Sequence, residues 1–410
     1  MRSRITPLDR ILPVVCAAAL CACSLGSGGT QGATATRAAA GATLEPEPFS
    51  GERAWAHLVA LTELGPRPSG SAASQEAFEY LRSRLADLDL EVVDLVLDSR
   101  DAAQDDSATA ASDAEKPESS AKPKEEGSAP PEPGITARHL VARIPGESPD
   151  SILLLAHYDT LPGSPGANDG ASGAAVLLEI ARQLAERPLP YTTEIVFLDH
   201  EMAVDEKDPT TPLLHGSWLL ADHLRDSGTF DVVRLAVFLR QVGDADLTVG
   251  RDLHSNRILR DVFFDVAREL GLGGAFPTER GFVEVVSSHR PFVQLGMPRV
   301  VSLVDPWYGG EEPPGEYWGG EADTVENCAP GSLRTVGVVS LGALRRISAQ
   351  LERIDRISGR AARRRAEAAE PAAEESPVPA EAPAEDPAEA PADGPEAPAE
   401  DPAEAAPESS

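Results

Sequence analysis

The feature that most constrains the fold is an unbroken apolar run at residues 152–156. A strand with one wet face alternates polar and apolar residues, so an unbroken run predicts a strand that is buried on both sides. The run ends at His157, and a loop rich in Gly and Pro follows. A second apolar run, at residues 194–198, also ends in polar residues. These two runs predict a central sheet that helices cover on both faces.

Helical and strand-like segments alternate through the rest of the chain. Helical periodicity covers residues 52–64, 73–88, 173–186, 217–224, 255–270, 291–295 and 332–347. Further strands are expected at residues 91–97, 139–144, 233–239 and 299–304. This alternation predicts the α/β class: three layers, with a mainly parallel central sheet and helices on both faces, in a single domain. Functional groups should gather where the parallel strands end.

Composition divides the 410 residues into segments. Residues 1–23 place three arginines before a short apolar stretch, which indicates a bacterial export signal. The sequence Leu20-Cys21-Ala22-Cys23 resembles a lipobox with Cys23 as the lipidated residue. We therefore expect a membrane-anchored lipoprotein of the bacterial cell envelope; the alternative is a cleaved signal peptide and a secreted protein. Residues 24–45 are typical of a flexible tether.

The folded domain is expected at residues 46–355, interrupted by a disordered acidic insertion at 101–134. Residues 361–410 form an acidic tail rich in Ala, Pro and Glu, which is also expected to be disordered. The insertion carries a net charge of −6 and residues 366–410 of the tail carry −14, out of −31 for the chain. Most of the acidity thus lies in solvated segments, and no basic stripe is present to bind nucleic acid. Cys328, the one cysteine of the folded domain, has no base near it in sequence and is expected to pack.

Polar residues at the predicted strand ends carry a family resemblance. His157 and Asp159 follow the first apolar run, Asp169 lies in Asn168-Asp169-Gly170, and Glu201 follows the second run. With GPRPSGS at 65–71, GDADL at 243–247 and Asp323-Thr324, these motifs resemble the zinc-dependent exopeptidase family that contains di-zinc aminopeptidases and glutaminyl-peptide cyclotransferases. The resemblance covers about residues 50–100 and 135–350.

The resemblance implies roles for these residues. His157 and Asp169 would bind zinc, Asp159 would orient the ring of His157, and Glu201 would act as general base. The zinc would polarise a carbonyl and activate water. Without the family context, Asp159 could cap a loop, and Asn168-Asp169-Gly170 could be a turn and helix N-cap.

Several positions depart from the family pattern. Met202, Arg240 and Gly319 stand where the resemblance implies metal ligands, and Ser287-Ser288-His289 replaces an acid pair before a histidine. Catalytic zinc normally has three protein ligands, so zinc is expected to be absent or weakly bound. Arg240 is expected to pair with Asp169 or Glu201 and to replace the charge of the metal. Substitute ligands are the alternative, from His200, His215, His223, His254 or His289.

Three functions remain open at this point. The chain is identified as a degenerate bacterial member of the family, a pseudoenzyme whose cleft binds a peptide N-terminus or a small amine-bearing ligand through Glu201 and Asp169. Alternatively, it is an active metallo-aminopeptidase or glutaminyl-peptide cyclotransferase with an altered metal site. A third possibility is an envelope structural protein that acts through its acidic tail. The oligomeric state stays open.

Overall fold

The computed structural model describes residues 49–99, 129–205, 208–360 and 363. The expected signal at 1–23 with Cys23, the tether at 24–45, most of the insertion at 101–134 and all of the tail except Arg363 lie outside these residues. The chain divides into two units, Met1–Ala369 and Glu370–Ser410, and every described residue belongs to the first.

Six strands form the central sheet in the order β1-β2-β4-β3-β7-β10. They are β1 (Glu91–Asp98), β2 (Thr136–Ile144), β3 (Ser148–His157), β4 (Tyr191–Leu198), β7 (Val233–Arg240) and β10 (Val300–Val304). Strands β4, β3, β7 and β10 are parallel, whereas β2 pairs antiparallel with both β1 and β4. The predicted α/β class with a mainly parallel sheet is confirmed. The antiparallel edge was not predicted, because residue alternation identifies a strand but not the direction of its neighbour.

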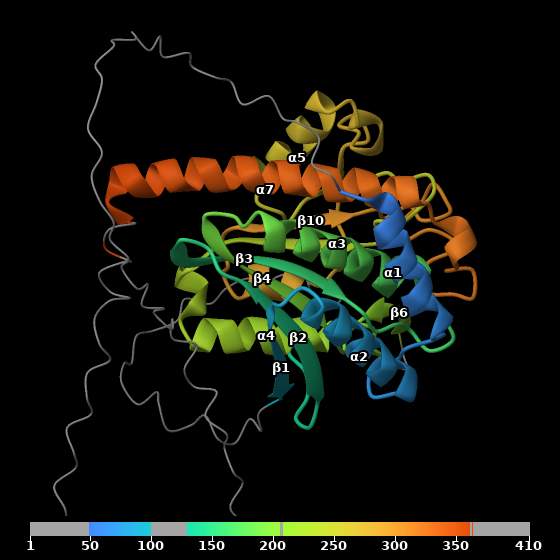
Figure 1. Cartoon of the computed structure of the whole chain (residues 1–410). Coiled ribbons are helices and arrows are strands. Elements are labelled where there is room, and N and C mark those ends of the chain that lie inside the picture. Colours follow the sequence, from blue (N-terminus) through green and yellow to red (C-terminus); the bar gives the residue numbers. More distant parts are fainter. Residues whose placement is uncertain (1–48, 100–128, 206–207, 361–362, 364–410) are drawn as a thin grey trace, which may run out of the picture. The chain divides into compact units, whose positions relative to one another are not determined.

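Helices cover both faces of the sheet (Figure 1). One face carries α1 (Gly51–Glu63), α2 (Ala72–Ala86), α3 (Gly173–Glu186), α5 (Arg257–Glu269) and α7 (Pro330–Ser358). The other face carries α4 (His215–Asp226) and α6 (Arg290–Gln294). Strand β3 serves both cores by alternation, since Leu154 packs on the α3 side while Leu153 and Leu155 pack on the α4 side.

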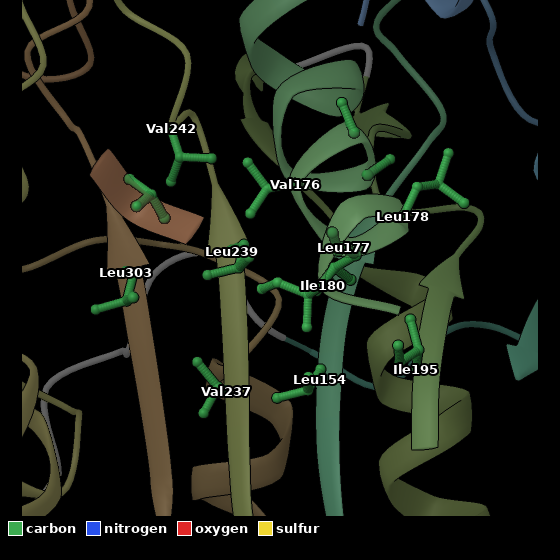
Figure 2. Close-up of a cluster of buried hydrophobic side chains, with 14 of the residues drawn as sticks. Leu154, Val176, Leu177, Leu178, Ile180, Ile195, Val237, Leu239, Val242 and Leu303 are labelled. Atoms are coloured by element: carbon green, nitrogen blue, oxygen red, sulfur yellow. The ribbon is translucent and has the colours of Figure 1, made fainter. Parts of the chain in front are cut away.

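The core beneath α3 is built from branched apolar side chains (Figure 2). Val176, Leu177 and Ile180 of α3 point toward the sheet, where Leu154 and Leu239 meet them. The face predicted for this helix is confirmed, because each of its predicted core residues is buried.

Helix α7 is longer than the sequence predicted. It begins at Pro330 and ends at Ser358, whereas the prediction ended at residue 347. Most residues of the extra turns are exposed, Ile354 and Ile357 among them, so no periodic buried face marks this part of the helix. The helix ends where Gly359 adopts a left-handed conformation with φ 70°, a usual C-terminal stop.

Two small strand pairs and several short turns complete the described chain. Strands β5 (Val204–Asp205) and β6 (Asp208–Pro212) pair antiparallel, and β8 (Arg251–Asp252) pairs parallel with β9 (Phe282–Val283). Single helical turns lie at Thr229–Asp231, Gly273–Ala275 and Val325–Asn327. These elements were not predicted, because a strand of two residues has no periodicity to detect. Across the described helices, none combines the length and the apolar character that a bilayer crossing requires.

Candidate functional site

The candidate site lies where the parallel strands end. β3 ends at His157, β4 at Leu198 and β7 at Arg240. A distorted turn, Ala167–Ser172, follows the loop after β3 and carries Asp169 with φ −96° and ψ 92°, outside helical values. This turn places the Asp169 side chain between the ends of β3 and β7, so residues far apart in sequence meet in one buried cluster.

Four donors converge on the carboxylate of Asp169. Arg240 donates through Nε to Oδ1 at 2.8 Å and through Nη2 to Oδ2 at 3.0 Å. His157 Nε2 lies 3.0 Å from Oδ1, and the Trp318 indole Nε1 donates to Oδ2 at 2.6 Å. Of the two partners expected for Arg240, the structure therefore has Asp169. The sequence analysis did not predict the Trp318 contact, which joins residues 149 positions apart.

The charges in this cluster support one another. Burial would raise the pKa of Asp169, but the charge of Arg240 and the hydrogen bond from His157 outweigh burial and hold that pKa well below its usual range. Burial also disfavours a charged His157, yet the nearby carboxylates of Asp159 and Asp169 raise its pKa to about 9. The two carboxylates thus favour the charged form of His157.

Asp159 connects the ends of β3 and β4. Its carboxylate Oδ2 accepts the backbone N–H groups of Glu201 at 2.9 Å and Met202 at 2.8 Å. His157 Nδ1 lies 3.1 Å from the backbone oxygen of Asp159 and 3.6 Å from its Oδ1. Asp159 therefore caps the loop after β4 as well as contacting the histidine that the family resemblance implies it orients.

Glu201 sits at the N-terminus of α4. Its carboxylate accepts the Ser217 backbone N–H at 2.5 Å and the Ser217 hydroxyl at 2.8 Å. A carboxylate is favourable at a helix N-terminus. Burial raises the pKa of Glu201, although hydrogen bonds from Ser288 and Ser217 oppose this shift. Glu201 thus accepts hydrogen bonds from Ser217 of α4, while its charge also acts on His157 and Arg240.

The remaining positions do not complete a zinc ligand set. The Met202 sulfur lies 3.4 Å from Arg240 Nη2 and accepts a hydrogen bond from it. Gly319 has φ 68°, and a Cβ there would lie 2.7 Å from Leu161 Cδ1. Because Arg240 occupies both carboxylate oxygens of Asp169, and Met202 and Gly319 offer no carboxylate or imidazole, the residues at these strand ends do not fit a zinc ion.

The other histidines do not gather at this cluster. His289 Nε2 lies 3.1 Å from Asp252 Oδ2, and His254 Nε2 lies 3.0 Å from Glu284. The rings of His200 and His215 are 5.4 Å apart. Within residues 49–99, 129–205 and 208–360, no three His, Cys, Asp or Glu side chains are arranged to hold a metal. Cys328 is buried, and burial raises its pKa, as expected of a packing residue.

A cleft of about 190 Å³ opens beside Arg240 and Trp318. Its walls are mainly apolar: Pro212, Val285, Val286, Pro306, Pro313, Pro314 and Trp318. The polar lining residues are Thr211, Arg240, Gln241 and Glu284. Concave, mostly apolar sites with a few placed polar groups are typical binding sites. Arg240 and Trp318, which both donate to Asp169, therefore also line a cleft.

Replacing Arg240 with Met should leave Asp169 with a buried, poorly compensated charge. We expect a loss of about 3–5 kcal/mol in the free energy of unfolding, measured in urea. The double variant Arg240→Met/Asp169→Asn should recover part of that loss, because the amide that replaces the Asp169 carboxylate carries no charge. Arg225→Met is the control: this exposed arginine pairs with Asp222 and Asp226, and its loss should cost at most about 1 kcal/mol. Strictly additive effects of the two changes would show that Arg240 and Asp169 are not coupled.

The raised pKa of His157 predicts a pH dependence of stability. Its folded value of about 9 exceeds the unfolded value of about 6.5, so its stabilisation is complete below the unfolded value and disappears as the pH rises through the folded one. The free energy of unfolding should therefore fall by roughly 3 kcal/mol through this window in the wild type. His157→Gln should lack this component. If the free energy of unfolding changes with pH identically in the two proteins, His157 does not have the raised pKa.

Comparison with known proteins identifies the family. The sequence profile of peptidase family M28 matches residues 139–344, half of the chain. Aminopeptidase YwaD of Bacillus subtilis is 50% identical over 50 residues, 12% of this chain and 10% of that protein. A putative endoplasmic reticulum metallopeptidase of Caenorhabditis elegans is 33% identical over 156 residues, 37% of this chain and 16% of that protein. The chain therefore matches less than a fifth of the length of these curated relatives.

Solved structures share the fold. A glutaminyl cyclase from an Acidobacteriales bacterium aligns with a TM-score of 0.59 at 23% identity, covering 78% of this chain and 100% of that one. A leucine aminopeptidase precursor from Bacteroides thetaiotaomicron aligns with a TM-score of 0.58 at 20% identity, covering 74% and 99%. A Zn-dependent exopeptidase from Parabacteroides distasonis gives 0.56 at 21%, covering 72% and 98%. Because the family profile matches half of the chain and the fold is that of these proteins, the chain belongs to peptidase family M28.

Proposed function

We propose that this member of family M28 is a non-catalytic binding protein that has lost zinc-dependent activity and keeps a cleft for a peptide end. The observation that carries the proposal is the two-bond pairing of Arg240 with Asp169. The guanidinium occupies both oxygens of the carboxylate that the family resemblance makes a zinc ligand. The fixed positive charge of Arg240 beside Asp169 also repels a divalent cation in this buried site.

The retained cleft supports binding of a single terminal residue. A cleft of about 190 Å³ is smaller than the roughly 300–1,000 Å³ of sites for drug-sized ligands. The Trp318 ring and four prolines present an apolar wall, which favours an apolar or aromatic side chain. The ligand class we propose is therefore the N-terminal residue of a peptide, or a small amine of similar size.

The ammonium group of such a ligand needs an accessible acceptor. The sequence analysis assigned that role to Asp169 and Glu201, but both side chains are buried and already accept hydrogen bonds from their neighbours. Glu284 also lines the cleft, and its side chain is 64% exposed, although its Oε1 already contacts His254 and Arg290. We therefore assign the ammonium to Glu284 within this proposal.

The location of the protein is part of the same proposal. Lipidation of Cys23 would hold the chain on the envelope membrane, since two acyl chains give stable anchoring. Labelled palmitate should enter the wild-type chain in its bacterial host, and Cys23→Ser should abolish labelling and release the protein into the soluble fraction. Equal labelling of the two chains would contradict lipidation at this residue.

Metal content and peptide binding test the proposed function together. The purified full chain, loaded with excess zinc and then desalted, should retain far less than one zinc per chain. Among peptides X-Ala-Ala-amide with all twenty first residues, calorimetry should detect binding for apolar and aromatic X. N-acetylation should weaken binding, and Glu284→Gln should do the same, whereas Glu311→Gln, an exposed carboxylate outside the cleft lining, should not.

Two results would overturn the proposal. Near-stoichiometric zinc that Asp169→Ala abolishes would show an active-type metal site, in line with an aminopeptidase or a cyclotransferase. Absence of binding across the whole peptide panel would remove the binding role and favour a structural one. The positive control for zinc binding is one variant that restores the family's ligand residues: Met202→Glu, Arg240→Asp and Gly319→His. This variant should also need Leu161→Ala, because a histidine at position 319 meets Leu161 and the backbone there is left-handed.

A further inference from the structure

Arg67 is a fully buried arginine in the loop after α1. Its guanidinium donates to five backbone carbonyl oxygens at 2.8–3.1 Å: Leu61, Gly65, Tyr158, Pro165 and Gly166. None of the hydrogen bonds found for it among the described residues goes to a carboxylate. Burial lowers its pKa to about 10, although the charges of Asp323 and Asp159 oppose this shift. Burying a cation in this way is costly unless its hydrogen bonds are satisfied, so these contacts demand a specific backbone geometry.

The carbonyls that Arg67 holds flank the residues of the site. Tyr158 lies between His157 and Asp159, and Pro165 and Gly166 directly precede the turn that carries Asp169. The Arg67 backbone adds two bonds to the same loop, since its N–H donates to the Thr160 hydroxyl at 2.7 Å and its carbonyl accepts the Thr160 N–H at 3.1 Å. Arg67 thus ties the end of β3 to the start of the Asp169 turn.

Asp323 accepts hydrogen bonds from the backbone N–H groups of the same turn. Its buried carboxylate accepts the backbone N–H of Asn168 at 2.6 Å and of Asp169 at 3.1 Å. Its backbone carbonyl accepts the N–H of Ala167 at 3.1 Å. These contacts reach across more than 150 residues, so the turn that carries Asp169 is shaped by distant parts of the chain.

Glycine at position 166 lets the guanidinium approach the turn. Gly166 has φ 62°, and a Cβ there would lie 2.2 Å from Thr160 Cγ2 and 3.0 Å from Arg67 Nη2. Any side chain at this position would push the arginine or the threonine away. The turn is therefore compatible with Arg67 only when residue 166 has no side chain.

We propose that Arg67 and Asp323 are positioning residues that hold the Asp169 turn from its carbonyl side and its N–H side. Together they impose the non-helical backbone of Asp169 and so aim its carboxylate at Arg240, His157 and Trp318. This role is independent of peptide binding and of metal, because it rests on contacts within the fold.

The Trp318 indole N–H reports the position of Asp169 directly. It donates to Asp169 Oδ2 at 2.6 Å, so its NMR resonance should lie downfield and its proton should exchange slowly. Trp318→Phe assigns the resonance. In Arg67→Met the resonance should move upfield and exchange should accelerate about tenfold or more, as a buried hydrogen bond opens. Asp323→Asn should shift the resonance in the same direction by a smaller amount.

Arg234→Met is the matched control. Arg234 is also buried, but it pairs with Asp150 and Asp355 and lies near the start of β7, at the opposite end of the strand from Arg240. Its loss should destabilise the fold without moving the Trp318 resonance. An unchanged resonance in Arg67→Met would overturn the proposal, as would an equal shift in Arg234→Met. If Arg67→Met does not fold, Asp323→Asn tests the proposal instead. An upfield shift of the Trp318 resonance in that variant supports the proposal, and an unchanged resonance overturns it.

Discussion

The buried ion pair between Arg240 and Asp169 is the interaction on which the arrangement of the strand ends depends. Removing either charge leaves the other in a site of low dielectric constant, which costs several kcal/mol. Both residues are almost fully buried, and their two parallel hydrogen bonds match the fork of the guanidinium to the carboxylate. The charged His157 and the Trp318 indole then complete the acceptor positions of Asp169.

The residues that hold the fold together are different from the residues that stand at the family's metal-ligand positions. The apolar cores on the two faces of the sheet require only that α3, α4 and the strands keep their packed faces. Neither core contains a strand-end polar group, so Met202, Arg240 and Gly319 can differ from the family pattern while the sheet persists. Function therefore has to be argued from the side chains at the strand ends and not from the fold. At the strand ends, the buried cluster in which Arg240 pairs with Asp169 lies beside a small apolar cleft.

Much of the fold was predictable because its signals are local. The unbroken apolar run of β3 and the periodic face of α3 depend on residues within one element, and both predictions are confirmed. At the site, the gathering of polar residues at the strand ends followed from the rule that parallel strands end at one edge of a sheet. The pairing of Arg240 with Asp169, one of two partners expected for it, followed from the family resemblance. The contacts of Trp318 and Arg67 did not follow from any such rule.

The sequence by itself determined which segments are buried strands and helices, and which kinds of side chain stand where those strands end. The reason is that side-chain periodicity and backbone sterics act over a few neighbouring residues. Only the tertiary structure decided that Asp159 caps the loop after β4, that Trp318 donates to Asp169, and that Arg67 and Asp323 brace the same turn. These contacts join residues up to 155 positions apart, and their geometry depends on how the packed elements close the intervening chain.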